Sequence, residues 1–475
     1  MFAKIVIYLS IKIMMRKFFY IFILLCLFGS SFAKEVKLSG IAPSYVGEQL
    51  EVRCNTNLMV GGERILATSV VDSTGAFSFT FDLLQTTQVF IPTETSRGYI
   101  FMEPGAQYEV KLLPRKERTL SQKLDPYFKP TDYMLDIVHL KHGDINAQIM
   151  EFEDAFDFYS MKHLVYGATP DSLKKSVGEI REIFPDFAAH RFLADYLDYR
   201  CMLILNMAQN VNQTKIIKEL NDKDIDVENP AFWDLFNTLF NDFIKQSAYD
   251  REQALTFSRV IEEGNVKMYL LNIKNRYGIN NQVLGELVAI KWLYDLLNSP
   301  EYDRVKVYEM LRGLGGAIQL DYNRDLLTEI LNGASAIQPG LEVPDLKART
   351  VKGKACGLSD FKGHYIYLNF GNSFIDQTQK DLNVMMRFQN DYGRDLDIVN
   401  IFLYDQQEQV ARLSQRFDGK MNFWLVEDSD AVKKMFGIKS LPAFFLIDKD
   451  GTFLMTKGAE PNDELKLLLQ RILKR

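Results

Sequence analysis

The alternation of apolar and polar residues changes character twice along the chain. From residue 34 to 118, short alternating runs are separated by turn residues. In the clearest run, Phe77-Ser-Phe-Thr-Phe81, three phenylalanines fall on one face of a strand, and serine and threonine fall on the other. Asp72-Ser-Thr-Gly75 before it is a turn sequence. Seven or so short strands at this spacing predict a small β-sandwich.

The middle of the chain, residues 119–335, has the apolar spacing of helices. Four aromatic residues recur at i, i+3, i+7 and i+10, which places them on one helix face: Trp233, Phe236, Phe240 and Phe243. We interpret this stripe as core and not as a ligand-binding surface. Val283 to Leu297 is a second periodic stretch. The sequence therefore predicts a helical region between two parts that contain sheets.

The last part of the chain alternates continuous apolar runs with helical patterns. A linker of small residues and proline, Ala334 to Gly340, precedes it. Continuous apolar runs are typical of strands that are buried on both faces. The expected strands are Tyr365–Phe370, Asp397–Tyr404, Phe423–Val426 and the run after Pro442. The expected helices are Ile375–Tyr392, Gln406–Phe417 and Glu464–Lys474, and the segment Ala431–Gly437 follows the third of these strands.

The order of these elements resembles the TlpA-like branch of the thioredoxin superfamily. Three short motifs carry the resemblance: Leu341-Glu-Val-Pro-Asp-Leu346, Leu358-Ser-Asp-Phe-Lys-Gly363 and Ser440-Leu-Pro-Ala443. It covers residues 339–475 and implies a thioredoxin-like α/β domain with Pro442 as its cis-proline. Residues 34–118 resemble the β-domain that often precedes such domains in exported proteins of Bacteroidetes-type bacteria. We therefore expect a multidomain α+β protein: β-sandwich, helical middle and thioredoxin-like domain.

The family's two catalytic cysteines are absent from this chain. The family carries Trp-Cys-x-x-Cys where a strand meets a helix, and here the junction is Phe374-Ile-Asp-Gln-Thr378. In the family, the first thiol sits at a helix N-terminus, which favours the thiolate, and the second resolves the mixed disulfide. Ile375 has no ionisable atom, and no base is evident for the hydroxyl of Thr378. The usual dithiol cycle therefore cannot run here, and we predict no catalytic residue.

Two interpretations of the junction remain open. Ser373-Phe-Ile-Asp376 fits a capping box, in which Ser373 caps the helix and Asp376 lies in its first turn. The former redox site would then be an ordinary helix start. In the other interpretation, Phe374 and Ile375 form an apolar patch that binds a peptide.

The resemblance also implies a role for the residues at the cis-proline. In the family, this proline turns the preceding backbone outward, so that a substrate segment pairs with it like an added strand. Leu441 would do this here, and the predicted peptide-binding set is therefore Phe374, Ile375, Leu441 and Pro442. The alternative is that Pro442 only shapes a turn that the fold requires.

The other candidate chemical groups are sparse. Cys54, Cys201 and Cys356 are far apart, without a Cys-x-x-Cys motif, and we interpret most of them as small buried residues. Two histidines at His139-Leu-Lys-His142 with Asp136 nearby are a set that zinc accepts, but the pattern of a further ligand is missing. Phosphate-binding, dinucleotide and nucleophile-elbow motifs are absent from the sequence. We predict neither a metal nor a cofactor.

Residues 1–33 have the pattern of a cleaved export signal. Arg16-Lys17 precedes an apolar run, Phe18 to Phe28, and Ser31-Phe-Ala33 fits a signal-peptidase site. We favour cleavage over an uncleaved membrane anchor and over a lipid anchor at Cys26, where the preceding residue is a leucine although a small residue is required. Met14 or Met15 would be a more natural first residue. The expected location is the periplasm.

Removal of that segment would make the chain more acidic. It takes away four basic residues and no acidic one, which leaves 52 basic against 62 acidic residues, a net charge of −10. This balance argues against non-specific binding of nucleic acid. The remaining segments are too short to span a bilayer; peripheral association with a membrane and the oligomeric state are left open.

Three functions compete at this point. The first is a binding or scaffold module of the cell envelope, whose partner is an extended peptide or an envelope protein. The second is a thiol–disulfide oxidoreductase that works through Cys356, Cys201 or the thiols of a partner. The third is a structural envelope protein whose binding surfaces lie on the β and helical parts. The sequence favours the first.

Overall fold

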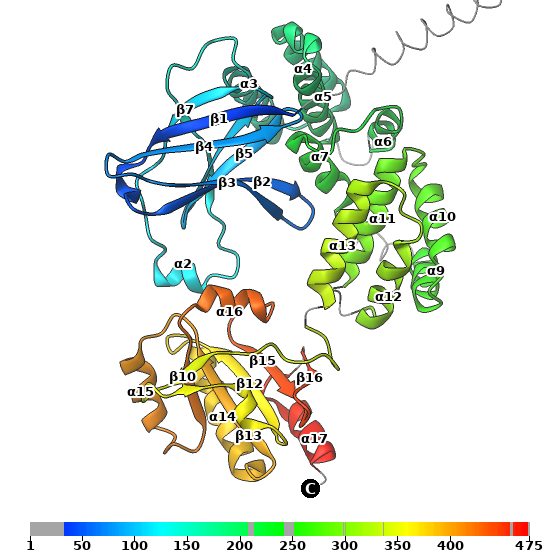
Figure 1. The fold of residues 1–475 in the computed structure, drawn as a ribbon. Helices are drawn as coiled ribbons and strands as arrows, with labels where there is room; N and C mark the ends of the chain where they lie inside the picture. The colour runs from blue at the N-terminus through cyan, green and yellow to red at the C-terminus, as the bar shows by residue number, and fades with distance from the viewer. Residues whose placement is uncertain are drawn as a thin grey trace, which may run out of the picture.

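The computed structural model describes residues 33–207, 213–241, 251–297, 299, 301–335, 337–456 and 459–473. Residues 1–32 of the predicted export signal, and Phe243 of the aromatic stripe, lie outside this range. The described chain forms a β-sandwich, a helical part and a C-terminal α/β domain (Figure 1). The expected multidomain architecture is confirmed.

The N-terminal part is a sandwich of two sheets, with strand orders β4-β1-β7-β9 and β3-β2-β5-β6-β8. Phe77, Phe79 and Phe81 point into its core, while Ser78 and Thr80 between them are exposed, as the alternation predicts. The first seven strands are β1 (Lys34–Ile41), β2 (Gln49–Asn57), β3 (Gly62–Val70), β4 (Ala76–Leu83), β5 (Thr87–Pro92), β6 (Ser96–Met102) and β7 (Gln107–Lys111), with a 3-10 turn η1 (Pro43–Tyr45).

Two further strands of the sandwich lie within the stretch expected to be helical. After a short helix α2 (Leu120–Leu124), β8 (Thr131–Met134) pairs with β6 and β9 (Asp136–Ile137) pairs with β7. Such short strands carry too few residues for an alternation signal; their position is set by the sheet edges that they complete. The first long helix begins only at residue 145.

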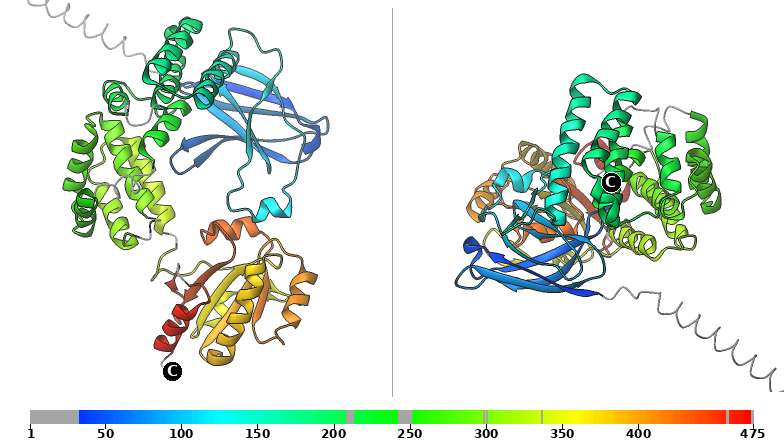
Figure 2. Two further views of the ribbon diagram at one scale, coloured as in Figure 1. Left: turned by 180° about the vertical axis from the view of Figure 1, so that it is seen from behind. Right: turned by 90° about the horizontal axis from the view of Figure 1, so that it is seen from above.

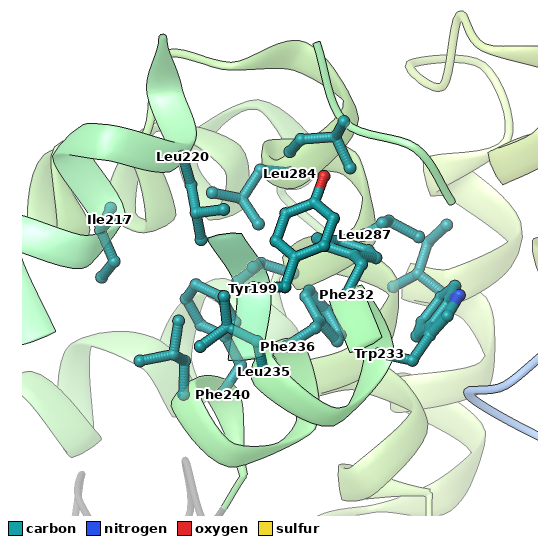
Figure 3. Close-up of a cluster of buried hydrophobic side chains, with 14 of the residues drawn as sticks. Tyr199, Ile217, Leu220, Phe232, Trp233, Leu235, Phe236, Phe240, Leu284 and Leu287 are labelled. Atoms are coloured by element: carbon teal, nitrogen blue, oxygen red, sulfur yellow. The ribbon is translucent and has the colours of Figure 1, made fainter. Parts of the chain in front are cut away.

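The helical part encloses one continuous core. Trp233, Phe236 and Phe240 are buried in it, as the aromatic spacing predicts, and pack near Leu284 and Leu287 (Figure 3). Its elements are α3 (Ile145–Tyr166), α4 (Pro170–Ile183), η2 (Pro185–Ala189), α5 (Arg191–Asn206), α6 (Gln213–Asn221), α7 (Pro230–Phe240), α9 (Arg251–Glu262), α10 (Val266–Tyr277), α11 (Gln282–Leu296), α12 (Arg304–Leu314) and α13 (Asp321–Ser335).

A buried amide joins the sandwich to the helical part. The side chain of Asn146, at the start of α3, is fully buried and donates to the backbone oxygen of Phe101 at 2.9 Å. It also accepts from the backbone N–H of Phe101 at 2.8 Å. The ring of Phe101 belongs to the core of the helical part, although its backbone is in β6. The two parts therefore share both packing and hydrogen bonds.

The C-terminal domain is a three-layer α/β structure around a seven-strand sheet of order β11-β10-β14-β13-β12-β15-β16. Its strands are β10 (Ala348–Thr350), β11 (Ala355–Cys356), β12 (Tyr365–Gly371), β13 (Leu396–Phe402), β14 (Asn422–Leu425), β15 (Ala443–Ile447) and β16 (Phe453–Met455). Its helices are η3 (Leu358–Phe361), α14 (Asp376–Tyr392), α15 (Gln407–Gln415), α16 (Ser429–Met435) and α17 (Asp463–Ile472). Helices α14, α15 and α17 pack on one face, and α16 and η3 on the other.

The C-terminal domain lies below the other two parts, with α16 beneath α2 in both side views (Figures 1 and 2). Arg118, just before α2, forms an ion pair with Asp430 of α16 at 2.6 Å. Over the described ranges, every helix is too short or too polar to cross a membrane.

Candidate functional site

The junction and the predicted cis-proline lie side by side at the ends of β12 and β15, two inner strands of the C-terminal sheet. Strands β12 and β15 are antiparallel neighbours, and Phe370 of β12 lies opposite Ala443 of β15. The next residues outward are Gly371 and Pro442, so the two segments leave the sheet together. The Leu441–Pro442 peptide bond is cis. The sheet register therefore brings together Gly371 and Pro442, which are 71 positions apart in the sequence.

The capping box predicted at the junction is wrong. Helix α14 begins at Asp376, with Ile375 at its N-cap position and no side-chain cap. Ser373 instead turns away from the helix, and its hydroxyl donates to the carboxylate of Asp405. Its backbone N–H donates to the other oxygen of the same carboxylate at 2.8 Å. The prediction for Asp376 is confirmed, because it lies in the first turn of α14.

A frame of polar side chains holds the turn between β12 and α14. The amide of Asn372 is fully buried; it donates to the backbone oxygen of Leu403 at 2.7 Å and accepts from the N–H of Phe374 at 3.0 Å. Gln379 donates to the backbone oxygen of Ser373 at 3.0 Å. The turn is thus fixed from β13 on one side and from α14 on the other.

The two predicted thiol positions hold no ionisable group. Thr378 is fully buried, and its hydroxyl has no hydrogen-bond partner among the residues that the structure describes. A Cβ added at Gly371 would lie only 2.6 Å from Cγ2 of Thr378, so the threonine fills the space beside the strand. Ile375 is half-buried at the N-cap. Neither side chain supplies a nucleophile for disulfide exchange.

The four residues of the predicted peptide-binding set differ in their surroundings. The side chain of Phe374 is 58% exposed. Leu441 is half-buried and packs against the core that α16 covers. Pro442 lines a cleft whose described lining includes neither Phe374 nor Ile375. The four residues lie at the same end of β12 and β15, but only Pro442 lines this cleft.

The three described cysteines are all free thiols. Burial raises the pKa of Cys54, that of Cys201 to about 12 and that of Cys356 to about 11. With that pKa, about one Cys356 thiol in 10⁴ is ionised at pH 7. Cys356 lies on β11, four strands away from β12, which at about 4.8 Å per strand is roughly 19 Å.

The histidine pair does not form a metal site. His142 pairs with Glu151 at 3.1 Å, and Asp136 lies 3.9 Å from Lys111. His139 adopts a left-handed backbone conformation with φ of 59°. Within the described residues, no three His, Cys, Asp or Glu side chains are grouped so that they could hold a metal ion.

Two clefts meet at the segment before Pro442. The first, which we call the inner cleft, has a volume of about 750 Å³ and lies between the helical part and the C-terminal domain. The second, the basic cleft, has a volume of about 590 Å³ and lies between residues 118–128 and the region of α16. Ile438, Lys439 and Ser440 line both.

The backbone of residues 439–441 is unpaired. Lys439 and Ser440 are exposed, and no backbone hydrogen bond joins residues 439–441 to any other described residue. Backbone N–H and C=O groups are strong donors and acceptors, and nearly all of them are paired in folded proteins. The backbone N–H and C=O groups of residues 439–441 are therefore available for hydrogen bonds to a ligand between the two clefts.

A buried carboxylate lies behind the junction. Asp381 of α14 is only 6% exposed and accepts a hydrogen bond from Gln377 at 2.8 Å. Burial raises its pKa; the bond from Gln377 lowers it, and the charge of Glu460 raises it further. The pKa of Asp381 is therefore higher in the folded than in the unfolded chain, so that folding favours the uptake of a proton by this carboxylate.

Asp381→Asn should stabilise the protein near neutral pH. The pKa of Asp381 is raised in the folded state, so its protonated form adds to the free energy of unfolding below the ordinary pKa of 3.8. This contribution disappears as the pH rises through the folded-state pKa, because the carboxylate must then be charged while buried. The variant should therefore melt at a higher temperature than the native chain at pH 7, and the difference should vanish below about pH 4. Thermal melts across this range, with the exposed Asp82→Asn as control, test it. An equal gain at all pH values would contradict the assignment.

Sequence reasoning missed the polar frame and the open segment. Asn372 directly follows a buried strand in Gly-Asn-Ser, a turn signal that points to its role. Asp405 follows β13, and parallel neighbouring strands end at the same edge, so its position beside the junction was also predictable. No local pattern indicated that Arg118 lies beside α16, because Arg118 comes from a different part of the chain and pairs with Asp430 only in the folded protein.

Comparison with known proteins agrees with the fold. Residues 339–454 match the AhpC/TSA family. The C-terminal domain is thus a thioredoxin-like domain, similar at low identity to thiol–disulfide oxidoreductases.

Two curated relatives illustrate the similarity. The thiol–disulfide oxidoreductase ResA of Bacillus thuringiensis subsp. konkukian is 27% identical over 135 residues, which cover 28% of this chain and 78% of that protein. The thioredoxin-like protein YneN of Bacillus subtilis is 24% identical over 118 residues, which cover 24% of this chain and 68% of that protein.

Solved structures are similar as well. A thioredoxin-like protein from Bacteroides caccae matches 50% of this chain and 93% of its own, with 15% identity and a TM-score of 0.34. The thioredoxin domain of a thiol–disulfide oxidoreductase from Bacteroides vulgatus matches 28% of this chain and 98% of its own, with 18% identity and a TM-score of 0.26.

Proposed function

We propose that the protein binds extended peptide segments of envelope proteins at the residues before Pro442, without transferring electrons. The observation that carries this proposal is the open backbone of residues 439–441. An extended chain laid beside it would gain the main-chain hydrogen bonds that give affinity in strand addition. The inner cleft next to it offers room for side chains.

The chemistry of the junction supports binding without redox turnover. Ile375 and Thr378 stand at the predicted thiol positions, and the three described thiols have raised pKa values. The exposed ring of Phe374, on the neighbouring segment, would add apolar contact to a bound peptide. We place this binding in the periplasm, since residues 1–33 have the pattern of an export signal.

The names of the relatives favour a second candidate, a thiol–disulfide oxidoreductase that acts through a non-standard cysteine. An insulin-reduction assay with dithiothreitol separates the two. We expect no turnover above the uncatalysed rate. Turnover that is lost in Cys356→Ser or Cys201→Ser would instead support the oxidoreductase.

The binding proposal is tested by removing one backbone donor. Peptides that bind the chain from residue 34 onward are selected from a random library, and their Kd is measured by fluorescence anisotropy. Ser440→Pro deletes the N–H of residue 440 and should weaken binding at least tenfold. Ser440→Ala, which keeps that N–H, should leave Kd unchanged.

Two results would count against the proposal. One is a library that yields no binder. The other is a Ser440→Pro variant that binds as tightly as the native chain, because the open backbone would then play no part. Thermal melts of both variants check that the fold is kept.

A further inference from the structure

The basic cleft carries an excess of positive charge. Four cations line it, Arg118, Lys123, Lys433 and Lys439, against one carboxylate, Asp125. The inner cleft is balanced, with Arg304 and Lys439 against Glu329 and Glu460, and most of its other lining residues are apolar. The two clefts that share residues 438–440 thus differ in chemistry.

Most of this positive charge lacks an acidic partner. Lys123, Lys433 and Lys439 form no ion pair with any described residue. Burial lowers the pKa of Lys433; Asp430 raises it, and Arg118 lowers it further. The ammonium of Lys433 lies 5.6 Å from the ring centre of Tyr404. The surroundings of Lys433 therefore disfavour a further positive charge, and a negatively charged group of a ligand would be stabilised there.

Arg118 has an unused donor in the same place. Its ion pair with Asp430 at 2.6 Å engages one terminal nitrogen. The Nε of Arg118 is buried and has no acceptor in the described part of the chain. A buried donor without an acceptor is unfavourable, so Arg118 gains from any acceptor oxygen that approaches its guanidinium group. Asp430 is already occupied, since it also accepts from the hydroxyl of Tyr404 at 2.6 Å.

From these observations we infer that the preferred ligand is an extended peptide in which an apolar stretch is joined to acidic residues. This inference rests on the proposed peptide binding at residues 439–441. A strand advances about 3.3 Å per residue, so a peptide paired there extends within a few residues into both clefts. Its apolar stretch occupies the inner cleft, and its carboxylates meet the cations of the basic cleft.

The preference is a local property of the cleft. The chain as a whole has a net charge of −6, so its overall field repels an acidic peptide. Arg118 and Lys123 come from the N-terminal part, and Lys433 and Lys439 from the C-terminal domain. The β-sandwich thereby contributes half of the charge that selects the ligand.

Two pairs of synthetic peptides test this inference. Each peptide has one apolar half of alternating valine and serine, and the other half contains either four glutamates or four glutamines; both orders are made. In low salt, the native chain should bind the glutamate peptide of one order at least tenfold more tightly than its glutamine counterpart. The ratio should fall toward one at high salt, because exposed charges are screened.

Matched variants locate the preference. Lys123→Gln with Lys439→Gln should reduce the ratio toward one, because it removes two of the four cations that line the basic cleft. The control, Lys116→Gln with Lys434→Gln, removes the same charge from exposed lysines in the same two regions that do not line the basic cleft. It should keep the tenfold ratio.

The outcomes separate this inference from the proposed function. Equal binding of both peptides, weakened by Ser440→Pro, would overturn the acidic preference and leave peptide binding intact. A ratio that survives Lys123→Gln with Lys439→Gln would also overturn it, because the carboxylates would then bind elsewhere. Absence of binding by every peptide would overturn both.

Discussion

The double substitution Ile375→Cys with Thr378→Cys is expected to turn an inert chain into a catalyst of insulin reduction by dithiothreitol. Position 375 is the N-cap of the seventeen-residue helix α14, where the helix dipole stabilises a thiolate. Position 378 lies one turn further on and is fully buried beside Gly371. The thiol at position 375 should have a pKa below about 8.5, so that its ionised fraction at pH 7 exceeds that of Cys356 by a hundredfold or more.

The single substitutions are the controls for this gain. Ile375→Cys alone should form mixed disulfides with the substrate but should not turn over, since no second thiol resolves them. Thr378→Cys alone should be inert, because its side chain is buried. A double variant that forms the internal disulfide and yet shows no turnover would mean that the junction lacks the geometry of a working site.

The second large effect is expected from Asn146→Ala, which should lower the free energy of unfolding by about 2–4 kcal/mol. The change leaves both the N–H and the C=O of Phe101 buried without a partner, each at a cost of about 1–3 kcal/mol. It also removes the hydrogen bonds that join α3 to β6. Urea unfolding measures the loss, followed by tryptophan fluorescence, which reports on Trp233 and Trp292 in the helical core and on Trp424 in the C-terminal domain.

Asn383→Ala serves as the matched control for the buried amide. Asn383 is exposed on α14, and its side chain donates only to the backbone oxygen of Gln379 at 3.0 Å. Its removal should change stability by no more than about 0.5 kcal/mol. If the two alanine variants unfold at the same urea concentration, the amide of Asn146 does not join the two parts energetically.

Local patterns were enough to predict most elements of this fold. The alternation at Phe77–Phe81 and the helical spacing of Trp233, Phe236 and Phe240 are confirmed, because each reports burial of one face of one element. The sequence analysis did not predict strands β8 and β9, because their few residues take their conformation from pairing with β6 and β7. The sequence therefore predicts an element well where the element itself carries the signal.

The site was less predictable because its decisive contacts are long-range. The motif at Ser373 suggested a cap, but Asp405, which lies 32 residues later, competes successfully for the same hydroxyl and N–H. The ion pair between Arg118 and Asp430 joins residues 312 positions apart. Such contacts depend on how the folded helices and strands pack against one another. A local sequence pattern holds no information about this packing.

The pairing of Asn146 with Phe101 has a consequence for the sandwich as a separate unit. Strand β8 accompanies β6 only as far as Tyr99, so the outer side of β6 beyond that residue is covered by the amide of Asn146 and by α3. If α3 detached, through proteolysis or local opening, this stretch would offer free main-chain groups to a second copy. Open strands of this kind recruit one another and aggregate. Helix α3 therefore covers backbone groups that would otherwise favour self-association, and it also connects the two parts.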